Sequence, residues 1–251
     1  ALLRLSANPH RPPWMPSHAP SIDLIRCPTP GSQSTGGLLR KGSFDLEPPM
    51  TISQDPPMTM PIVKYGHPVL RQRGKTIDAF DASLHRLVDE MLETMYQADG
   101  VGLAAQQIGK ALQLTVVDVS QSEDRPSSMT IGGKEVVLEE HMPLVLVNPS
   151  VEKLTAPISG PEGCLSFPEI YADIERPERV AVTAQDPEGH SMKFECDGLL
   201  AKAIQHEVDH LNGILFIDRM PAKEKEHWRP KLESMRMETQ QALQRDENTS
   251  S

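Results

Sequence analysis

The sequence is short of cysteine, of long apolar runs and of positive charge, and each shortage argues against a class of protein. Three cysteines, Cys27, Cys164 and Cys196, are spread over 251 residues, which is untypical of a secreted disulfide framework and favours a reducing compartment. No apolar run approaches the roughly 20 residues of a membrane helix, so we expect no membrane partner. The net charge of −10 argues against direct nucleic-acid binding, because such proteins usually carry a basic face.

The two ends of the chain differ in composition from the part between them. Residues 1–57 carry eleven of the 23 prolines and no sustained apolar period, which predicts a disordered, proline-rich extension. Early arginines and serines in this stretch leave organelle targeting as a minor alternative to a cytoplasmic location. Residues 223–251 form a charged tail that is predicted to be partly helical, after Pro230.

Periodic structure begins between these ends. The apolar residues of 81–97 recur at the three-and-four spacing of one helical face, which predicts an amphipathic helix. The apolar runs at 112–119 and 143–148 predict buried strands. The polar, turn-rich stretch 120–142 between them predicts a loop that carries a hairpin.

The next segment predicts a hairpin followed by a helix. Apolar residues alternate in RVAVTAQD and SMKFEC on either side of the turn PEGH, which predicts an antiparallel pair with Cys196 facing inward. A helix is predicted over 198–212 and is stopped by Gly213. This order of elements predicts an α+β fold in which mostly antiparallel sheets wrap around the 198–212 helix, with an N-terminal and a C-terminal helix.

The central helix carries the pattern H-E-x-x-H. At 100° per residue, His206 and His210 emerge one turn apart from one mostly apolar side, which is the spacing that a single metal ion needs. Glu207 is expected to be buried beside the metal position, whereas Asp209 points away, to the surface or behind the ligands. The pattern is typical of two zinc-type ligands and a general base. The alternative is a pair of core-facing histidines with ordinary hydrogen bonds and a salt-bridged glutamate.

A catalytic metal generally needs a third protein ligand. Downstream, His227 and several glutamates follow no zinc-protease signature. Upstream, Cys164 lies in GPEGCLSFPE, a stretch whose glycines and prolines are more typical of a loop than of a strand. The alternative for Cys164 is a buried, inert cysteine.

Three stretches resemble the signature motifs of peptide deformylases and occur in the family's order. They are GVGLAAQQ (100–107), EGCLS (162–166) and QHEVDH (205–210). Three such motifs in order are highly specific, and the resemblance makes residues 58–222 the catalytic domain. The chain departs from the family in its N-terminal extension and in the longer loop at 120–142.

The resemblance implies a metallohydrolase that removes the formyl group from N-formyl-methionyl peptides and releases formate. It implies one divalent metal, Fe²⁺ first, with Zn²⁺, Ni²⁺ or Co²⁺ as alternatives that thiolate ligation would also suit. It suggests the ribosome as a further partner and the bacterial cytoplasm as the location. Position by position, it assigns the metal to Cys164, His206 and His210 and the general base to Glu207. It assigns the oxyanion donors to the Gln107 amide and the Leu165 N–H, and substrate binding to Gly102. From the sequence alone, Val101 and Leu103 on either side of this glycine are nominated as pocket walls.

Two other functions remain open at this point. A zinc protease that cuts internal peptide bonds would act on unformylated peptides and tolerate Cys164→Ser. In a catalytically silent relative, the metal would only stabilise the fold. The presence of Glu207, Gln107 and Cys164 argues against the silent relative, because a structural site needs neither a base nor an oxyanion donor.

Overall fold

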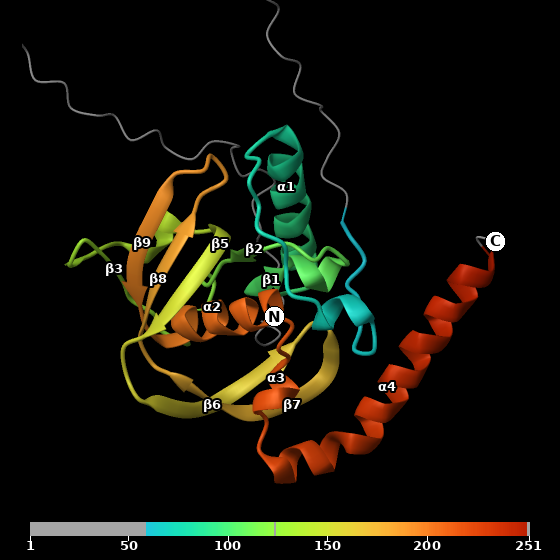
Figure 1. Ribbon diagram of the computed structural model, residues 1–251. Helices are drawn as coiled ribbons and strands as arrows, with labels where there is room; N and C mark the ends of the chain where they lie inside the picture. The colour runs from blue at the N-terminus through green and yellow to red at the C-terminus, as the bar shows by residue number, and fades with distance from the viewer. Residues whose placement is uncertain (1–58, 123, 250–251) are drawn as a thin grey trace, which may run out of the picture. The chain divides into compact units, whose positions relative to one another are not determined.

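The computed structural model describes residues 59–122 and 124–249, so the predicted extension over 1–57 lies outside the described part. The described residues form two antiparallel sheets and four α-helices (Figure 1). The larger sheet has the strand order β1-β2-β5-β8-β9-β3-β4. Its strands are β1 (Gly102–Ala104), β2 (Leu114–Val117), β3 (Met129–Ile131), β4 (Lys134–Glu135), β5 (Leu144–Lys153), β8 (Val180–Gln185) and β9 (Ser191–Cys196). The predicted α+β class with mostly antiparallel sheets is confirmed.

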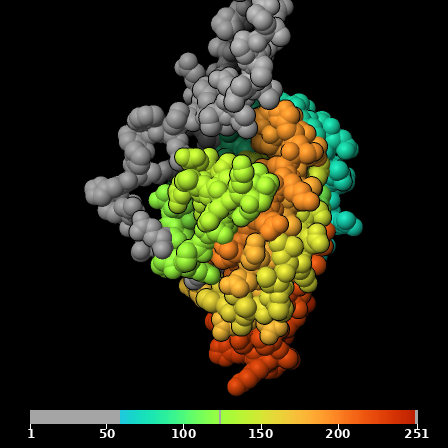
Figure 2. Space-filling view, turned by 90° about the vertical axis from the view of Figure 1, so that its left-hand side faces the viewer, coloured from blue at the N-terminus to red at the C-terminus, as the bar shows by residue number. Residues whose placement is uncertain are grey.

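The two predicted hairpins lie side by side in this sheet. Strands β8 and β9 pair from Val180 opposite Cys196 to Gln185 opposite Ser191, and Cys196 is buried, as its inward position predicts. The 120–142 segment contains the β3–β4 hairpin, and β3 pairs with β9. Figure 2 shows this segment, in lime green, against the orange atoms of the neighbouring strands. The polar segment therefore extends the edge of the sheet.

The central strands differ in length from their predictions. Strand β2 is shorter than the run 112–119, whereas β5 continues past Asn148 to its end at Lys153. The extension pairs with β8 after a bulge between Val147 and Ser150. Long-range pairing, which the local apolar run does not reveal, thus determines where β5 ends.

Helix α2 (Gly198–Leu211) runs between the two sheets (Figure 1). Its Leu200 and Ile204 are fully buried in one core cluster with residues of β2, β5, β8 and β9. Its polar residues Lys202 and Gln205 are also at least nine-tenths buried. The predicted central helix is confirmed, and these two polar side chains are covered by protein.

The residues around Cys164 form a strand, so the predicted loop is wrong. Strand β6 (Pro157–Cys164) pairs antiparallel with β7 (Phe167–Pro177) in the smaller sheet. A two-stranded sheet has only edge strands, and edge strands tolerate proline and glycine. Cys164 is thereby placed at the end of β6, immediately before the tight connection to β7.

Helix α1 (Ala82–Gln97) is the predicted amphipathic helix. The Asp81 side chain caps it by accepting hydrogen bonds from the backbone N–H groups of Ser83 and Leu84. Its apolar face packs in a cluster with residues of β1 and β2. The short helices are η1 (Pro68–Arg71), η2 (Ala105–Ile108), η3 (Leu138–His141) and α3 (Phe216–Arg219).

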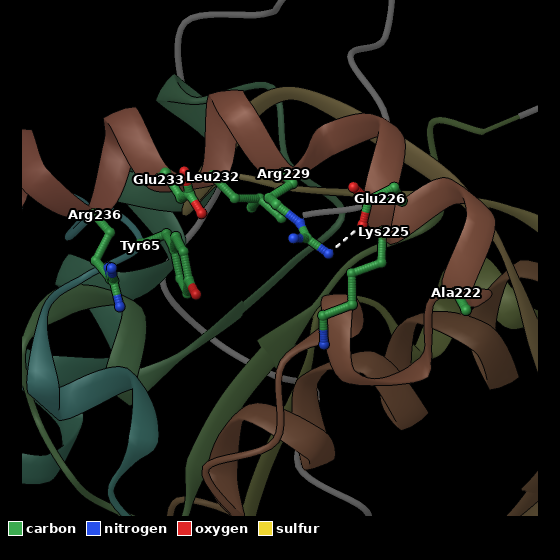
Figure 3. Close-up of a pocket in the computed structure, with 8 residues that line it drawn as sticks. All are labelled: Tyr65, Ala222, Lys225, Glu226, Arg229, Leu232, Glu233 and Arg236. Atoms are coloured by element: carbon green, nitrogen blue, oxygen red, sulfur yellow. Dashed lines mark hydrogen bonds and ion pairs between the residues drawn. The ribbon is translucent and has the colours of Figure 1, made fainter.

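Helix α4 (Ala222–Thr249) begins before Pro230, and not after it as predicted. An interior proline removes one backbone hydrogen bond and bends a helix, and Figure 1 shows α4 bent. The Trp228 Nε1 donates to the carbonyl of Tyr171 in β7 at 2.9 Å. A cavity of about 420 Å³ lies between α4 and Tyr65 (Figure 3). Among the residues that the structure describes, no helix combines the length and apolar character needed to span a bilayer.

Candidate active site

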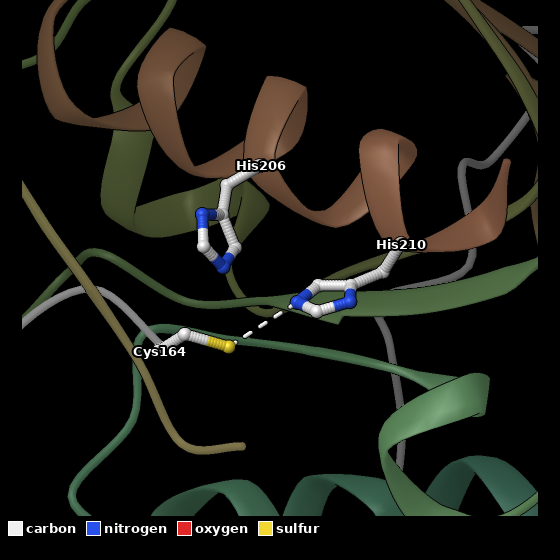
Figure 4. A group of neighbouring side chains, drawn as sticks. All are labelled: Cys164, His206 and His210. Atoms are coloured by element: carbon white, nitrogen blue, oxygen red, sulfur yellow. Dashed lines mark hydrogen bonds between the residues drawn. The ribbon is translucent and has the colours of Figure 1, made fainter. Parts of the chain in front are cut away.

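Three potential metal ligands converge between β6 and α2 (Figure 4). Cys164, His206 and His210 are buried, and their ligand atoms lie within 4.8 Å of one another. The Cys164 Sγ is 3.3 Å from the His210 Nε2. The His206 Nε2 is buried and has no hydrogen-bond partner in the described part of the chain. Because buried polar nitrogens are normally satisfied, this donor set of one sulfur and two imidazoles fits a divalent metal of borderline softness.

The charges in the site favour a thiolate. Burial raises the pKa of the Cys164 thiol, but the adjacent His210 and His206 outweigh this effect and lower the pKa well below its usual value. Burial lowers the pKa of His206, but its interactions with Cys164 and Glu162 raise the pKa to about 9. The thiolate is the form of cysteine that binds a metal, so the surroundings of Cys164 favour the form that could act as a ligand.

Glu162 orients the His206 ring. Its Oε2 lies 3.0 Å from the His206 Nδ1, and its Oε1 accepts a hydrogen bond from the Arg176 Nε at 2.7 Å. Burial raises the pKa of Glu162, but the hydrogen bonds from His206 and Arg176 lower it to about 2. An ionised carboxylate only accepts, so Nδ1 carries a hydrogen, which leaves Nε2 as the nitrogen that can give up its proton to bind a metal.

Asp209 is buried, so the surface position considered for it is wrong. It is 7% exposed, it accepts from the Arg176 Nη1 at 2.5 Å and it pairs with Arg219. Arg176 of strand β7 lies between Glu162 and Asp209 and pairs with both. The alternative position for Asp209, behind the predicted metal ligands, agrees with its pairing with Arg176.

Glu207 is fully buried on α2, as the helical wheel predicts. Its carboxylate lies against the backbone of Gly102, where a Cβ would come within 2.6 Å of the Glu207 Oε1. Glycine is therefore required at this position for close approach. The contact joins the GVGLAAQQ motif to the central helix, 105 positions apart in the chain.

The side chain of Gln107 is held in one orientation. Its Oε1 accepts the backbone N–H of Ala104 at 2.9 Å, and its Nε2 lies 3.5 Å from the Cys164 Sγ. A backbone N–H can only donate, so the oxygen must face Ala104 and the amide hydrogens must face the ligand cluster. Leu165 follows Cys164 directly, and its carbonyl accepts from the Lys64 Nζ at 2.9 Å.

The residues on either side of Gly102 belong to the core. Val101 is 2% exposed and packs in the cluster around α2, whereas Leu103 is 0% exposed and packs in the cluster around α1. Both residues flank Gly102, whose backbone contacts the Glu207 carboxylate. Their suggested role as pocket walls stays a prediction.

The sequence reasoning missed Glu162, Arg176 and Lys64 as site residues. A signal was present for Glu162, because residues two apart in a strand share a face and Glu162 stands two before Cys164. The assignment of this stretch as a loop removed that signal. No local pattern marks Arg176 or Lys64, because both reach the site through long-range contacts.

A family model described as polypeptide deformylase matches residues 59–226. The chain belongs to this family. The peptide deformylase of Methylacidiphilum infernorum (isolate V4) is 49% identical over 179 residues, which cover 71% of this chain and 94% of that protein. The chloroplastic peptide deformylase 1B of Oryza sativa subsp. japonica is 44% identical over 167 residues, or 66% of this chain and 56% of that protein. The crystal structure of the peptide deformylase from Thermus thermophilus is 36% identical, with a TM-score of 0.61 over 72% of this chain and 99% of that one.

Membership of the deformylase family decides between the functions that the H-E-x-x-H pattern left open. The chain is a metal-dependent hydrolase that removes the N-terminal formyl group from nascent peptides. The three motifs that carried the resemblance meet at one place in the fold, around the Cys164, His206 and His210 cluster.

Proposed function

We propose that Cys164, His206 and His210 hold the catalytic metal of this deformylase. The proposal is supported by the buried cluster of one sulfur and two imidazoles beside the Gln107 amide. Fe²⁺ is the first choice, with Zn²⁺, Ni²⁺ and Co²⁺ as alternatives, because these donors suit softer ions than Mg²⁺ or Ca²⁺. When bound, such a metal lowers the pKa of a water molecule and supplies hydroxide near neutral pH.

Glu207 is the proposed general base and acid. It is buried one residue after His206, and its carboxylate lies against the backbone of Gly102. In this role it accepts the proton of the attacking water and passes it to the amine that leaves as the formyl C–N bond breaks. The same carboxylate thus serves both halves of the reaction.

The oxyanion donors are proposed to be the Gln107 side-chain amide and the Leu165 backbone N–H. Gln107 is fixed through Ala104, so its amide hydrogens need no rearrangement as negative charge develops on the formyl oxygen. Donors that are held in place before the reaction stabilise such charge most effectively. Leu165 follows Cys164 directly, in the connection between β6 and β7.

Substrate binding is proposed at Gly102, with Val101 and Leu103 beside it. The backbone of Gly102 already lies against Glu207, so a peptide held there would be next to the general base. The formyl hydrogen is the smallest acyl substituent. Crowding at this contact would therefore exclude acetylated peptides on steric grounds.

The deciding experiment measures formate release from formyl-Met-Ala-Ser by the enzyme loaded anaerobically with Fe²⁺. We expect wild type to release formate and Glu207→Ala to lose about 10³-fold in kcat while retaining its metal. Glu195→Ala makes the same change at a half-exposed residue of β9 and should be as active as wild type. Loaded wild type that releases no formate would contradict the function, and an active Glu207→Ala would contradict the assigned base.

Cys164→Ser separates the deformylase from a zinc protease. We expect this variant to lose most of its bound metal and its activity, because a serine hydroxyl is a far weaker ligand than a thiolate. Unformylated Met-Ala-Ser should remain uncut by every variant. Cleavage of that peptide, together with indifference to Cys164→Ser, would favour the protease.

The substrate class also suggests a partner and a location. Formyl-methionyl chains begin at the ribosome, so we propose the ribosome as a partner and the bacterial cytoplasm as the location, with organelle targeting by residues 1–57 as the alternative. Helix α4 contributes 28 residues, nearly all of them at least partly exposed, that could meet such a partner. Co-sedimentation of the full chain with bacterial ribosomes would support the partner, and its absence at low salt would contradict it.

A further inference from the structure

Residues 63–65 lie between the two segments that carry the proposed oxyanion donors. The backbone N–H of Val63 donates to the Gln107 carbonyl at 2.9 Å, and that of Tyr65 donates to the Ser166 carbonyl at 3.0 Å. Between them, the Lys64 Nζ donates to the Leu165 carbonyl at 2.9 Å. One three-residue segment is thus bonded to η2 on one side and to the β6–β7 connection on the other.

The distance between the two donors depends on contacts of this kind. Gln107 and Leu165 belong to different elements, and neither element alone determines where the other donor lies. A displacement of about 1 Å in an active site can cost up to roughly 100-fold in rate. Hydrogen bonds that join the segment of Gln107 to the segment of Leu165 are therefore expected to affect the rate of deformylation.

Among these hydrogen bonds of residues 63–65, the bond from Lys64 is the one made by a side chain. The neighbouring Tyr65 is anchored independently, because its ring stacks on that of Phe167 at 4.9 Å between centroids. Lys64 itself is exposed and reaches the Leu165 carbonyl by a flexible side chain. Exposed polar bonds of this kind contribute little to folding stability, so the Lys64 bond can be removed without unfolding the protein.

We propose that Lys64 is a positioning residue of the deformylase reaction, which by holding the Leu165 carbonyl keeps the Leu165 N–H at the right distance from the Gln107 amide. This inference rests on the proposed roles of those two donors. Lys64 acts through the peptide turn and touches no reacting atom. The alternative is that the Lys64 hydrogen bond only stabilises the turn between β6 and β7 at the surface and has no effect on catalysis.

The first test compares Lys64→Met with Lys64→Arg and with wild type in metal-loaded enzyme. We expect Lys64→Met to lower kcat about tenfold, with KM within about twofold, because the donors act on the transition state. Lys64→Arg keeps a donor at the same place and should recover most of the rate. Melting temperature and bound metal should match wild type in both variants.

Lys110→Met is the matched control. Lys110 is an exposed lysine three residues after Gln107, and its side chain makes no hydrogen bond within the described ranges. It should retain the wild-type kcat. If Lys64→Met also retains the wild-type kcat, or if its loss is accompanied by loss of metal or a lower melting temperature, the positioning role is wrong.

A double-mutant cycle provides the sharper test. In a Gln107→Ala background the spacing between two donors no longer matters, so the tenfold effect of Lys64→Met should shrink to less than about threefold. An undiminished effect in that background would overturn the proposal. Failure of the proposed function has a different signature, since wild type would then release no formate. If Gln107→Ala is as active as wild type, the oxyanion assignment is wrong and the Lys64 inference falls with it.

Discussion

The Glu162 Oε2 lies 3.0 Å from the His206 Nδ1, and both side chains are almost completely buried. The two residues are 44 positions apart and come from β6 and α2. This contact connects the strand that ends at Cys164 to the helix that carries both histidines. It also decides which nitrogen of His206 is available to a metal.

Glu162→Gln should weaken metal binding. The amide can still accept from His206, but it loses the charge that raises ligand basicity and that balances Arg176. We expect the metal affinity to fall about 10- to 100-fold, measured by competition with a chelator of known affinity. Glu195→Gln, at an exposed carboxylate paired with Arg179, is the matched control and should bind metal as wild type does.

Arg176→Met should destabilise the fold. Its side chain is 3% exposed and bridges Glu162 and Asp209, so the change removes one counter-charge from each of two buried carboxylates. Breaking a buried pair of this kind costs about 3–5 kcal/mol in the free energy of unfolding, measurable by urea denaturation. Arg179→Met breaks the exposed pair with Glu195 and should cost at most about 1 kcal/mol. Equal costs for the two variants would contradict the prediction.

The stability of the metal-free protein should depend on pH through Glu162. Its pKa is about 2 in the folded protein against an ordinary 4.5, so the unfolded chain binds the proton more readily. The resulting stabilisation is fully present above pH 4.5 and is lost as the pH falls toward 2. This shift corresponds to about 3 kcal/mol. In Glu162→Gln the free energy of unfolding should fall less steeply over this range, and an unchanged slope would refute the assignment.

Gly102→Ala should damage catalysis more than folding. The new Cβ would lie 2.6 Å from the Glu207 Oε1 and displace the proposed base. We expect kcat for formate release to fall about 100-fold. Gly109→Ala is the contrasting control, because Gly109 has a φ of +81° but open space around its Cβ. That variant should lose about 1 kcal/mol of stability through backbone strain and keep its kcat.

Local periodicity in the sequence predicted the elements that depend on neighbouring residues. The apolar spacing of 81–97 predicted α1, and alternation predicted the β8–β9 hairpin with Cys196 inward. The wheel of α2 also predicted that Glu207 is buried beside two histidines on one side. These features follow from the pitch of a helix and the two-residue period of a strand, which act over a few residues.

Tertiary structure alone decided what covers each side chain. The sequence left Asp209 either at the surface or behind the ligands, and the structure places Arg176 of β7 against it. The stretch around Cys164 is a strand only because β7 pairs with it. The Lys64 bond to Leu165 likewise joins residues 101 positions apart. Periodicity predicts the direction in which a side chain points from its own helix or strand. Which residue it then contacts depends on the packing of segments that are far apart in the chain.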